Sequence, residues 1–362
     1  MRLRFVIVSM IVLALSVVTG HAQTFTGTVD GYWSYNGNTP VVAGQRVNVG
    51  RAFDLYDQAF SLNYGELAVD YKPNNVGIRV DVGFGDAAEV VHINETNIWR
   101  HIQQAYISAG KDKFTFDFGK FVTPFGAEVI ETKDNLNYTR GLVFTFGLPF
   151  YHFGGRATFG QSENVSISAY VVNGWDNVKE NNSAKSIGVS ANIKPHGKVG
   201  IIGNMLYGKE STVSDDAREL YEGILNLNLH ERFALIGDFV YGRDHFAPLA
   251  PGISGPEVWW QGVAGYAKIK VLDNLNINGR YEWFDDDAGF RTGTPQEAQS
   301  ATITAQIPVS DLNVFAEFRK DWSNQNSFLT TDDGPLGPLN TFKDHQNTFT
   351  IGLVYSFTKM VN

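Results

Sequence analysis

The 362-residue sequence contains no cysteine and few charged residues. The absence of cysteine excludes disulfide frameworks, thiolate zinc sites and cysteine nucleophiles. Charged residues make up 19% of the chain, compared with roughly 25% in an average globular domain. With 38 acidic and 29 basic residues the formal net charge is -9, so the chain offers no basic stripe to a nucleic-acid backbone. Nucleic acid is therefore not an expected partner.

Long apolar runs are missing after the first 22 residues. No later window reaches the roughly 18 consecutive apolar residues that a spanning helix requires, and the mean hydropathy is -0.16. A bundle of membrane helices is therefore excluded. Aromatic residues, by contrast, are abundant and make up 13% of the chain.

The first 22 residues have the pattern of a cleaved signal peptide. Arg2 and Arg4 precede an apolar stretch over residues 5–18, and Gly20-His21-Ala22 provides a small-residue cleavage site. A membrane anchor would need about 20 apolar residues, which this stretch does not reach. We expect export from the cytoplasm and a mature chain, residues 23–362, that forms a single domain.

Apolar and polar residues alternate in many segments of the mature chain. In Phe114-Thr-Phe-Asp-Phe118 every second residue is phenylalanine, and Leu275-Asn-Ile-Asn-Gly-Arg-Tyr-Glu-Trp283 has the same period of two. This period is typical of strands with one apolar and one polar face. It predicts sixteen strands, near residues 24–35, 58–72, 75–85, 99–110, 113–121, 149–159, 164–174, 184–194, 198–208, 217–228, 231–241, 257–271, 274–284, 297–307, 311–321 and 346–357.

The connections between these strands alternate between long and short. The short ones, such as Pro73-Asn74 and Pro195-His-Gly197, consist of turn-forming residues. We therefore predict an all-β fold, a transmembrane antiparallel up-and-down β-barrel of about 16 strands with short periplasmic turns and long external loops, located in the bacterial outer membrane. A soluble sandwich fits less well, because so many strands in series suit one closed ring without edges.

All seven tryptophans lie at predicted strand ends that border long loops. Indole rings prefer the headgroup level of a bilayer, so an aromatic girdle is expected at the external interface. The predicted girdle consists of Trp33, Trp99, Trp175, Trp259, Trp260, Trp283 and Trp322.

The last predicted strand carries a further mark of an outer-membrane barrel. Gly352, Tyr355 and Phe357 form a pattern similar to the C-terminal insertion signal of such barrels, although five residues follow Phe357. This pattern predicts recognition by the barrel-assembly machinery.

If the alternate apolar residues face lipid, the opposite face of each strand lines the barrel interior. Sixteen strands close into a ring about 30 Å wide, which side chains of the wall cannot fill. Water is therefore expected inside, unless another segment enters. The predicted pore-lining residues carry both signs of charge and are Arg79, Asp81, Asp117, His152, Arg156, Arg280, Glu282, Glu317 and Arg319.

The longest connection, residues 122–148, is the candidate for narrowing the lumen. It contains many apolar side chains that would not remain in bulk water, so we expect it to fold inward against the wall. This would present Glu128, Glu131, Asp134 and Arg140 to the lumen, where fixed charges select solutes. An unrecognised strand pair within these residues is an open alternative.

Motifs for catalysis or metal binding are missing from the sequence. It has no HExxH, GxSxG or P-loop motif, and Gly83-Phe-Gly85-Asp-Ala-Ala88 continues a strand instead of opening a helix. The acidic run Asp285-Asp-Asp287 lacks the spacing of a calcium loop. We expect no cofactor, no metal and no enzymatic activity.

Four segments resemble a known family. Phe118-Gly-Lys-Phe-Val-Thr-Pro-Phe-Gly-Ala-Glu128, Asn137-Tyr-Thr-Arg140, Pro149-Phe-Tyr-His-Phe-Gly154 and Val172-Asn-Gly-Trp175 are similar to the OmpL-like β-barrel porin family of Gram-negative bacteria. The resemblance extends through most of the mature chain and implies an outer-membrane porin without catalytic residues. Because the stretch most like the family contains them, the resemblance adds two residues to the candidate constriction, Lys120 and Pro124.

Together these features predict a water-filled porin for passive diffusion of small hydrophilic solutes. A channel specific for sugars or sugar acids stays open, favoured slightly by lumenal aromatics such as Tyr106, Tyr170 and Phe315. A barrel enzyme and an occluded structural barrel are further alternatives. Expected partners are outer-membrane lipid, the assembly machinery and the solutes, and a homotrimer is expected by analogy with other sixteen-stranded porins.

Overall fold

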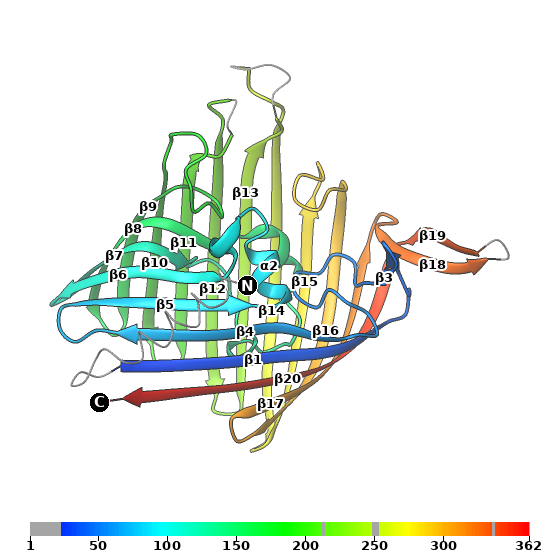
Figure 1. The fold of residues 1–362 in the computed structure, drawn as a ribbon, viewed down its shortest axis with the longest axis horizontal. Coiled ribbons are helices and arrows are strands. Elements are labelled where there is room, and N and C mark those ends of the chain that lie inside the picture. Colours follow the sequence, from blue (N-terminus) through cyan, green and yellow to red (C-terminus); the bar gives the residue numbers. More distant parts are fainter. Residues whose placement is uncertain (1–22, 212–213, 248–252, 335–336, 362) are drawn as a thin grey trace.

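The computed structural model describes residues 23–211, 214–247, 253–334 and 337–361. The predicted signal peptide, residues 1–22, lies outside the described residues. Within them, sixteen antiparallel strands form one closed barrel, in which each strand pairs with its neighbours along the chain and β1 closes the ring on β20 (Figure 1). The predicted fold class is therefore confirmed.

Every predicted strand overlaps one strand of the barrel. The barrel strands are β1 (Gln23–Asn36), β4 (Phe60–Tyr71), β5 (Val76–Phe84), β6 (Ile102–Lys111), β7 (Phe114–Val122), β8 (Tyr151–Ser162), β9 (Val165–Val172), β10 (Ser186–His196), β11 (Val199–Lys209), β12 (Ala217–His230), β13 (Phe233–His245), β14 (Glu257–Leu272), β15 (Leu275–Asp286), β16 (Gln296–Val309), β17 (Leu312–Ser323) and β20 (His345–Val361).

The alternation in sequence becomes an outer apolar face and an inner polar face. On β7 the side chains of Phe114, Phe116 and Phe118 are exposed on the outside, whereas Asp117 between them is buried inside. Successive residues of a strand point to opposite faces, so one apolar residue in two suffices to cover the barrel with a lipid-compatible surface.

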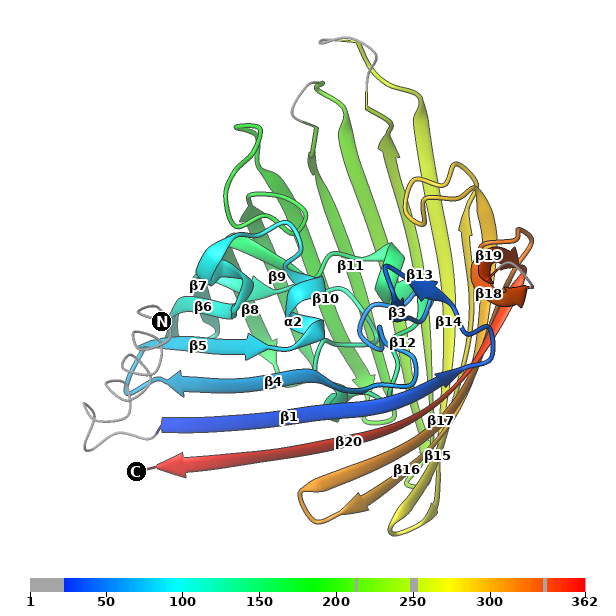
Figure 2. The ribbon, with the colours of Figure 1, turned by 45° about the vertical axis from the view of Figure 1, so that its right-hand side comes forward.

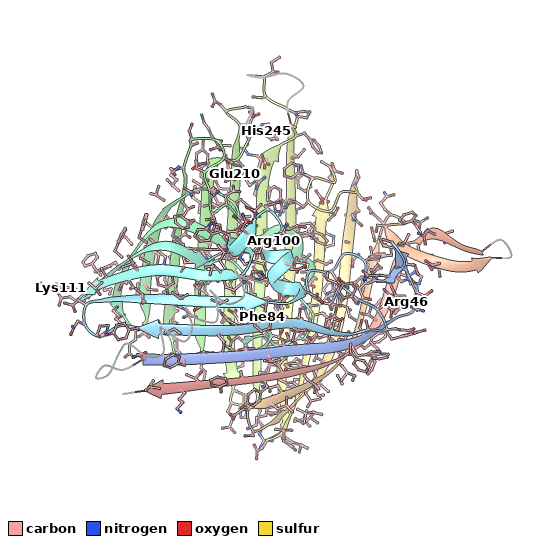
Figure 3. All side chains as sticks on the ribbon, in the orientation of Figure 1. Arg46, Phe84, Arg100, Lys111, Glu210 and His245 are labelled. Atoms are coloured by element: carbon pink, nitrogen blue, oxygen red, sulfur yellow. The ribbon has the colours of Figure 1, made fainter. Side chains whose placement is uncertain are left out.

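The short turns gather at one end of the barrel and the long connections at the other. Figure 3 places Lys111, the last residue of β6 before a short turn, at the opposite end from Glu210 and His245, which border long connections. We refer to these as the short-turn end and the long-loop end.

Some of the long connections contain structure that the sequence pattern did not predict. The first long connection holds a hairpin of β2 (Val41–Val42) and β3 (Gln45–Arg46). The last holds a hairpin of β18 (Phe328–Gly334) and β19 (Gly337–Lys343), and this second hairpin projects sideways from the barrel (Figure 1). The second contains α2 (Asp86–Val91) and the 3-10 turn η1 (Asn97–Arg100). In the described part of the chain no helix is both long and apolar enough to cross a bilayer.

The barrel closes through the pairing of its first and last strands. All 14 residues of β1 pair with β20, from Gln23 with Val361 to Asn36 with Thr348. Residues 358–361, which follow the predicted insertion signal, therefore extend this seam. A Cβ at Gly27 would lie 2.3 Å from the ring of Phe357, so the absence of a side chain there allows the ring to lie across β1.

The connection between β7 and β8, residues 123–150, folds into the barrel, as the sequence predicts. It holds the 3-10 turn η2 (Thr132–Asp134) and the π-helix η3 (Val143–Gly147) and contains no strand pair. Its backbone lies inside the ring (Figure 2), and its apolar residues form a buried cluster with residues of the wall. The cluster includes Leu142, Val143 and Leu148 from the connection and Val240, Trp260 and Phe284 from the wall.

The tryptophans divide between the two faces of the barrel. Trp33, Trp259, Trp283 and Trp322 lie on the outer face of their strands near the long-loop end. Trp99 lies in η1, and its ring packs edge-on against Phe153 at 6.3 Å.

Two members of the predicted girdle lie inside the molecule instead. Trp260 is completely buried, and its Nε1 donates to the carbonyl of Gly147 in the inward connection at 3.2 Å. Trp175 is also buried and packs edge-on against Trp260, with 6.1 Å between ring centroids. Because Trp259 and Trp260 are consecutive strand residues, they face opposite sides of the wall. The girdle prediction was wrong for the two buried residues, Trp260 and Trp175.

Candidate functional site

The inward connection is attached to β15 through buried charges. Arg280 donates from Nη1 to Glu128 Oε1 at 2.6 Å and to the carbonyl of Thr139 at 2.5 Å. Its Nε lies 3.0 Å from Oε2 of Glu282, and Glu282 Oε1 accepts from the backbone N–H of Val143 at 3.2 Å. All three charged side chains are almost completely buried, so they hold the connection in place and do not line open space.

A second attachment involves β17. Glu317 accepts the backbone N–H of Tyr138 at 2.7 Å, and Arg319 donates to the carbonyl of Arg140 at 2.5 Å. Arg319 also pairs with Asp321 at 2.6 Å, and Asp321 in turn pairs with Arg51 of the first long connection at 2.8 Å. The predicted pore-lining residues of β17 are thus part of a buried ionic network that joins two connections to the wall.

The side chain of Tyr138 contacts the wall at the seam between β1 and β20. Its hydroxyl donates to Asp30 of β1 at 2.5 Å, and Thr132 donates to the other oxygen of Asp30 at 2.5 Å. Burial raises the pKa of Tyr138 well above its ordinary value, so the hydroxyl remains a donor. The ring fits over Gly352 of β20, where a Cβ would lie only 2.2 Å from two ring carbons.

Arg140 organises the connection itself. Its guanidinium donates to the carbonyls of Val129, Ile130 and Tyr138 at 2.8, 2.7 and 2.6 Å, and to the hydroxyl of Thr132 at 2.9 Å. The side chain is buried. Arg140 therefore fixes the backbone of the connection and, contrary to the sequence-based expectation, presents no charge to the lumen.

The start of the connection is bound to β11, β12 and β13. Asn204 donates to the carbonyl of Pro124 at 3.0 Å, Glu222 accepts the N–H of Gly126 at 2.8 Å, and Asp238 accepts the N–H of Ala127 at 3.3 Å. The contacts of the connection thus extend from β11 through β17 to β20 and β1. At the level of these contacts, the connection fills this half of the interior.

On the other half of the interior, along β4–β9, some inward side chains stay partly accessible to solvent. Arg79 of β5 and Arg156 of β8 face inward, and their side chains are 35% and 21% exposed. They pair with Asp81 at 2.9 Å and Asp117 at 2.8 Å. A cavity of about 150 Å³ beside Arg79 continues toward the short-turn end and is lined by Thr24, Thr26, Ala68 and Asp70.

The turn η2 of the inward connection faces this open half. Asp134 is 54% exposed and pairs with Lys133. Glu131 lies close enough to Glu66 to affect the ionisation of that residue, and its own ionisation is affected by Asp81. Burial raises the pKa of Glu131 above its ordinary value, with Asp134 and Asp81 acting in the same direction and Lys133 opposing them.

Two further predicted site residues have structural contacts. Lys120 pairs with Phe153 in the sheet, on the face opposite Phe121, and its Nζ donates to the carbonyl of Ile102 at 2.7 Å. It is buried and does not reach the inward connection. His152 faces inward but is also buried, and it hydrogen-bonds the carbonyl of Gly174 at 3.0 Å and the hydroxyl of Thr123 at 3.1 Å.

Aromatic rings and arginines alternate at the long-loop end. The guanidinium of Arg291 lies 4.8 Å from the ring centroid of Trp175 and 5.2 Å from that of Trp260. The guanidinium of Arg218 also lies 4.8 Å from the ring centroid of Trp175. Burial, together with the positive charge of Arg218, lowers the pKa of Arg291 to about 10. This cluster attaches the end of the inward connection, because Arg291 donates to the carbonyl of Phe146 at 2.6 Å.

Asp176 in the same region holds the start of β8. Its Oδ1 accepts the N–H groups of Phe150 at 2.6 Å and Tyr151 at 3.1 Å. Burial nevertheless raises the pKa of Asp176 to about 7, because desolvation of the carboxylate outweighs these two hydrogen bonds.

Several residues at or near the inward connection were missed by the sequence analysis, namely Asp30, Glu66, Tyr138, Glu222 and Asp238. Four of them are acids at inward strand positions, and the alternation used elsewhere would have placed them there if it had been extended to β1, β4, β12 and β13. Nothing in the sequence pattern identifies Tyr138, because its partner Asp30 is more than a hundred residues away.

The family model described as "Putative beta-barrel porin-2, OmpL-like" matches residues 23–357. The chain belongs to this family. The closed barrel with its inward connection is accordingly that of an outer-membrane porin, with its short turns on the periplasmic side. No protein with a curated description matches the chain in sequence.

Solved structures with a similar fold include an outer-membrane protein, a porin and an outer-membrane channel. OmpT of Vibrio cholerae superimposes with a TM-score of 0.60 at 13% identity, over 94% of this chain and 99% of that one. An anion-selective porin from Comamonas acidovorans gives 0.62 at 11% identity, over 93% and 100%. The channel DcaP of Acinetobacter baumannii gives 0.59 at 13% identity, over 94% and 99%. At these identities the similarity concerns the fold alone.

Proposed function

We propose that this porin conducts small hydrophilic solutes by passive diffusion through the half of its lumen that borders β4–β9. One observation carries the proposal. Inward-facing Arg79 and Arg156 remain accessible to solvent, whereas Arg280 and Arg319 on the other half are completely buried. A polar surface that is inside the barrel and wet is what a diffusion channel requires.

The narrowest part of the path is proposed to lie between η2 and the wall strands β4–β8. Three ion pairs there balance their own charges: Arg79 with Asp81, Arg156 with Asp117, and Lys133 with Asp134. Glu66 and Glu131 form no ion pair among the described residues, so each adds unbalanced negative charge when it is ionised. Fixed charge at a constriction favours counter-ions, so the channel prefers cations.

Planar-bilayer recording of the purified porin tests the proposal. We expect stepwise, ohmic openings, and absence of conductance from a folded, heat-modifiable barrel would mean an occluded lumen. Glu131→Lys reverses one of the unbalanced charges and should move the zero-current potential in a salt gradient toward that of an anion-preferring channel. Arg156→Glu should move it in the opposite direction.

Arg243→Glu is a matched control for these charge reversals. Arg243 lies on the outer face of β13 and pairs with Glu219 at 2.5 Å and Glu257 at 3.2 Å, away from the proposed path. Selectivity that changes as much in Arg243→Glu as in Arg156→Glu would remove Arg156 from the pore.

A sugar-specific channel has less support from the lumenal aromatics than the sequence suggested. Tyr170 and Phe315 are buried, Phe315 beneath Tyr138 at 5.8 Å between ring centroids, and only Tyr106 is partly exposed. Two of the three rings therefore cannot stack on a passing sugar. Current block that saturates with sugar concentration would reverse this conclusion.

The remaining parts of the proposal concern export and assembly. Residues 1–22 direct export as a cleaved signal peptide, the outward tryptophans contact the external lipid interface, and Gly352, Tyr355 and Phe357 present the insertion signal to the assembly machinery. The porin carries out no chemical reaction and needs no cofactor. A homotrimer is proposed because one related structure of Vibrio cholerae OmpT is a trimer form, and native mass spectrometry in detergent tests this directly.

A further inference from the structure

A positively charged cavity lies at the short-turn end, on the side formed by β10–β14. Its volume is about 510 Å³, and its lining includes Lys198 from the turn between β10 and β11, Arg232 from the turn between β12 and β13, and Lys268 from β14. These residues lie on three separate segments, at the opposite end of the barrel from the tryptophans.

The strand register brings the three cations together. The carbonyl of Lys198 accepts the N–H of Asn228 at 2.8 Å, so the first turn rests on β12. The carbonyl of Arg232 accepts the N–H of Lys270 at 2.9 Å, and Lys268 pairs with Ala234 just beyond that turn. Lys268 occupies the same face of β14 as the buried residue Tyr266, so its side chain is on the lumenal side.

These cations outnumber the acids around them in the part of the chain that the structure describes. Among the described residues, neither Lys198, Arg232 nor Lys268 forms an ion pair, whereas the neighbouring Lys270 pairs with Asp273 at 2.9 Å. Glu231 is the one carboxylate that lines the cavity, and it is exposed. Asp273, the partner of Lys270, also lies close enough to Arg232 to interact with it. Three positive charges therefore face two negative charges, one of which is already paired.

The neutral groups of the cavity add further donors. The N–H of Arg232 donates to Nδ1 of His230 at 3.1 Å, so the proton of the neutral ring is on Nε2, which is left as a donor. Asn228 contributes a side-chain amide. Ammonium, guanidinium, amide and imidazole N–H groups together match the several acceptor oxygens of a phosphate or carboxylate.

We propose that Lys198, Arg232 and Lys268 form a binding site for oxyanions, either phosphate or carboxylate groups, at the periplasmic exit of the lumen. The proposal goes beyond passive diffusion and does not depend on it, since an anion can bind to this rim whether or not the channel conducts. It gives the exit a charge opposite to that of the constriction.

The test is a titration of the folded porin in detergent with inorganic phosphate, followed by ³¹P NMR line broadening at constant ionic strength. Wild type should show saturable binding. The variant K198Q/R232Q/K268Q should bind phosphate about tenfold more weakly or not at all, because it loses three charge-assisted donors. Heat-modifiable migration shows that each variant is folded.

A matched control removes three lysines from the other side of the same end. Lys72 and Lys113 lie in short turns, and Lys111 is the last residue of β6. They form no ion pair among the described residues and line no cavity described above; Figure 3 shows the position of Lys111. K72Q/K111Q/K113Q has the same net charge as the first variant and should bind phosphate within about twofold of wild type. Equal loss in both variants, or no saturable binding in wild type, would overturn the proposal.

The source of the oxyanion is distinguished by a second titration in nanodiscs. If a lipid headgroup is the ligand, phosphatidylglycerol should compete with inorganic phosphate in wild type, and phosphatidylcholine discs should not. If a free solute is the ligand, phosphate should bind equally in both kinds of disc. Saturable binding in neither kind of disc would contradict both forms of the site.

Discussion

At the scale of single residues, Gly352 shows how one missing side chain positions an entire connection. The ring of Tyr138 occupies the space that a Cβ would need, and its hydroxyl and N–H are bound to Asp30 and Glu317. The glycine predicted as part of an insertion signal therefore also acts in the folded barrel, as the seat of the inward connection.

Gly352→Val should displace Tyr138 while the strand itself still pairs. Overpacking of a tight interior costs about 1–3 kcal/mol, so we expect a lower temperature for loss of compact migration on gels, together with a larger single-channel conductance. Gly203→Val is the control, because a Cβ at Gly203 meets nothing within 4 Å. Equal effects of the two substitutions would show that Tyr138 is not seated by Gly352.

The elevated pKa of Glu131 predicts a pH-dependent selectivity. The carboxylate attracts cations while it is ionised, so cation preference should decline as the pH falls through the raised pKa of Glu131, at a higher pH than for an ordinary glutamate. Glu131→Gln should have a weaker cation preference at pH 7.5 and a smaller change on acidification to pH 5. Zero-current potentials in a salt gradient measure both, and identical pH profiles for the two proteins would contradict the assignment.

Asp176 makes a prediction about stability instead of transport. Its pKa is about 7 in the folded porin and near its ordinary value after unfolding, so between about pH 4 and 7 the folded state alone holds the proton. The free energy of unfolding should therefore fall by up to about 1.4 kcal/mol for each unit that the pH rises across this window. Above pH 7 it should stay level.

Asp176→Asn keeps an acceptor for Phe150 and Tyr151 and removes the buried charge. It should be more stable than wild type at pH 8.5, and the two should converge as the pH approaches 4. Thermal loss of compact migration at several pH values measures this difference, and a gap independent of pH would refute the role given to Asp176.

At the scale of elements, the inward connection is held by ions more than by its own secondary structure. Arg280 is the central group, since it contacts both Glu128 of the connection and Glu282 of the wall. Removing one member of a buried charge group leaves the others uncompensated, at a cost of about 3–5 kcal/mol.

Arg280→Met should therefore destabilise the porin strongly and increase its conductance as the connection detaches. Arg243→Met is the matched control, because Arg243 also contacts two acids on neighbouring strands but is 40% exposed, and exposed pairs contribute about 1 kcal/mol or less. Calorimetry in detergent compares the two, and similar losses would mean that burial does not determine the strength of these pairs.

The elements also show which parts of this structure a sequence can predict. The strands were found because lipid and water on opposite faces impose a period of two, visible in Phe114, Phe116 and Phe118. The hairpin β2–β3 has only two residues per strand, too few to show a period. The partners of the inward connection were not predictable, because Arg280 and Glu128 are 152 residues apart and no local pattern links them.

At the scale of the whole molecule, the ring depends on its final strand. β20 provides the partner for all of β1 and for most of β17, so its loss would expose two unpaired edges. Deletion of residues 345–362 should abolish the heat-modifiable barrel. Deletion of residues 358–362 alone removes only the last pairs of the seam and should leave a folded barrel with a lower melting temperature, which gel migration in outer-membrane fractions distinguishes.

The division of the interior into a filled half and a wet half has a consequence for how this porin can change. Most contacts that hold the inward connection are on β11–β17, whereas the proposed path exposes solutes to β4–β9. Substitutions along the wet half can therefore alter which solutes pass with little penalty in folding. Solute selectivity can therefore change during evolution while the packing of the opposite half preserves the barrel. For the same reason, selectivity can be redesigned for nanopore sensing.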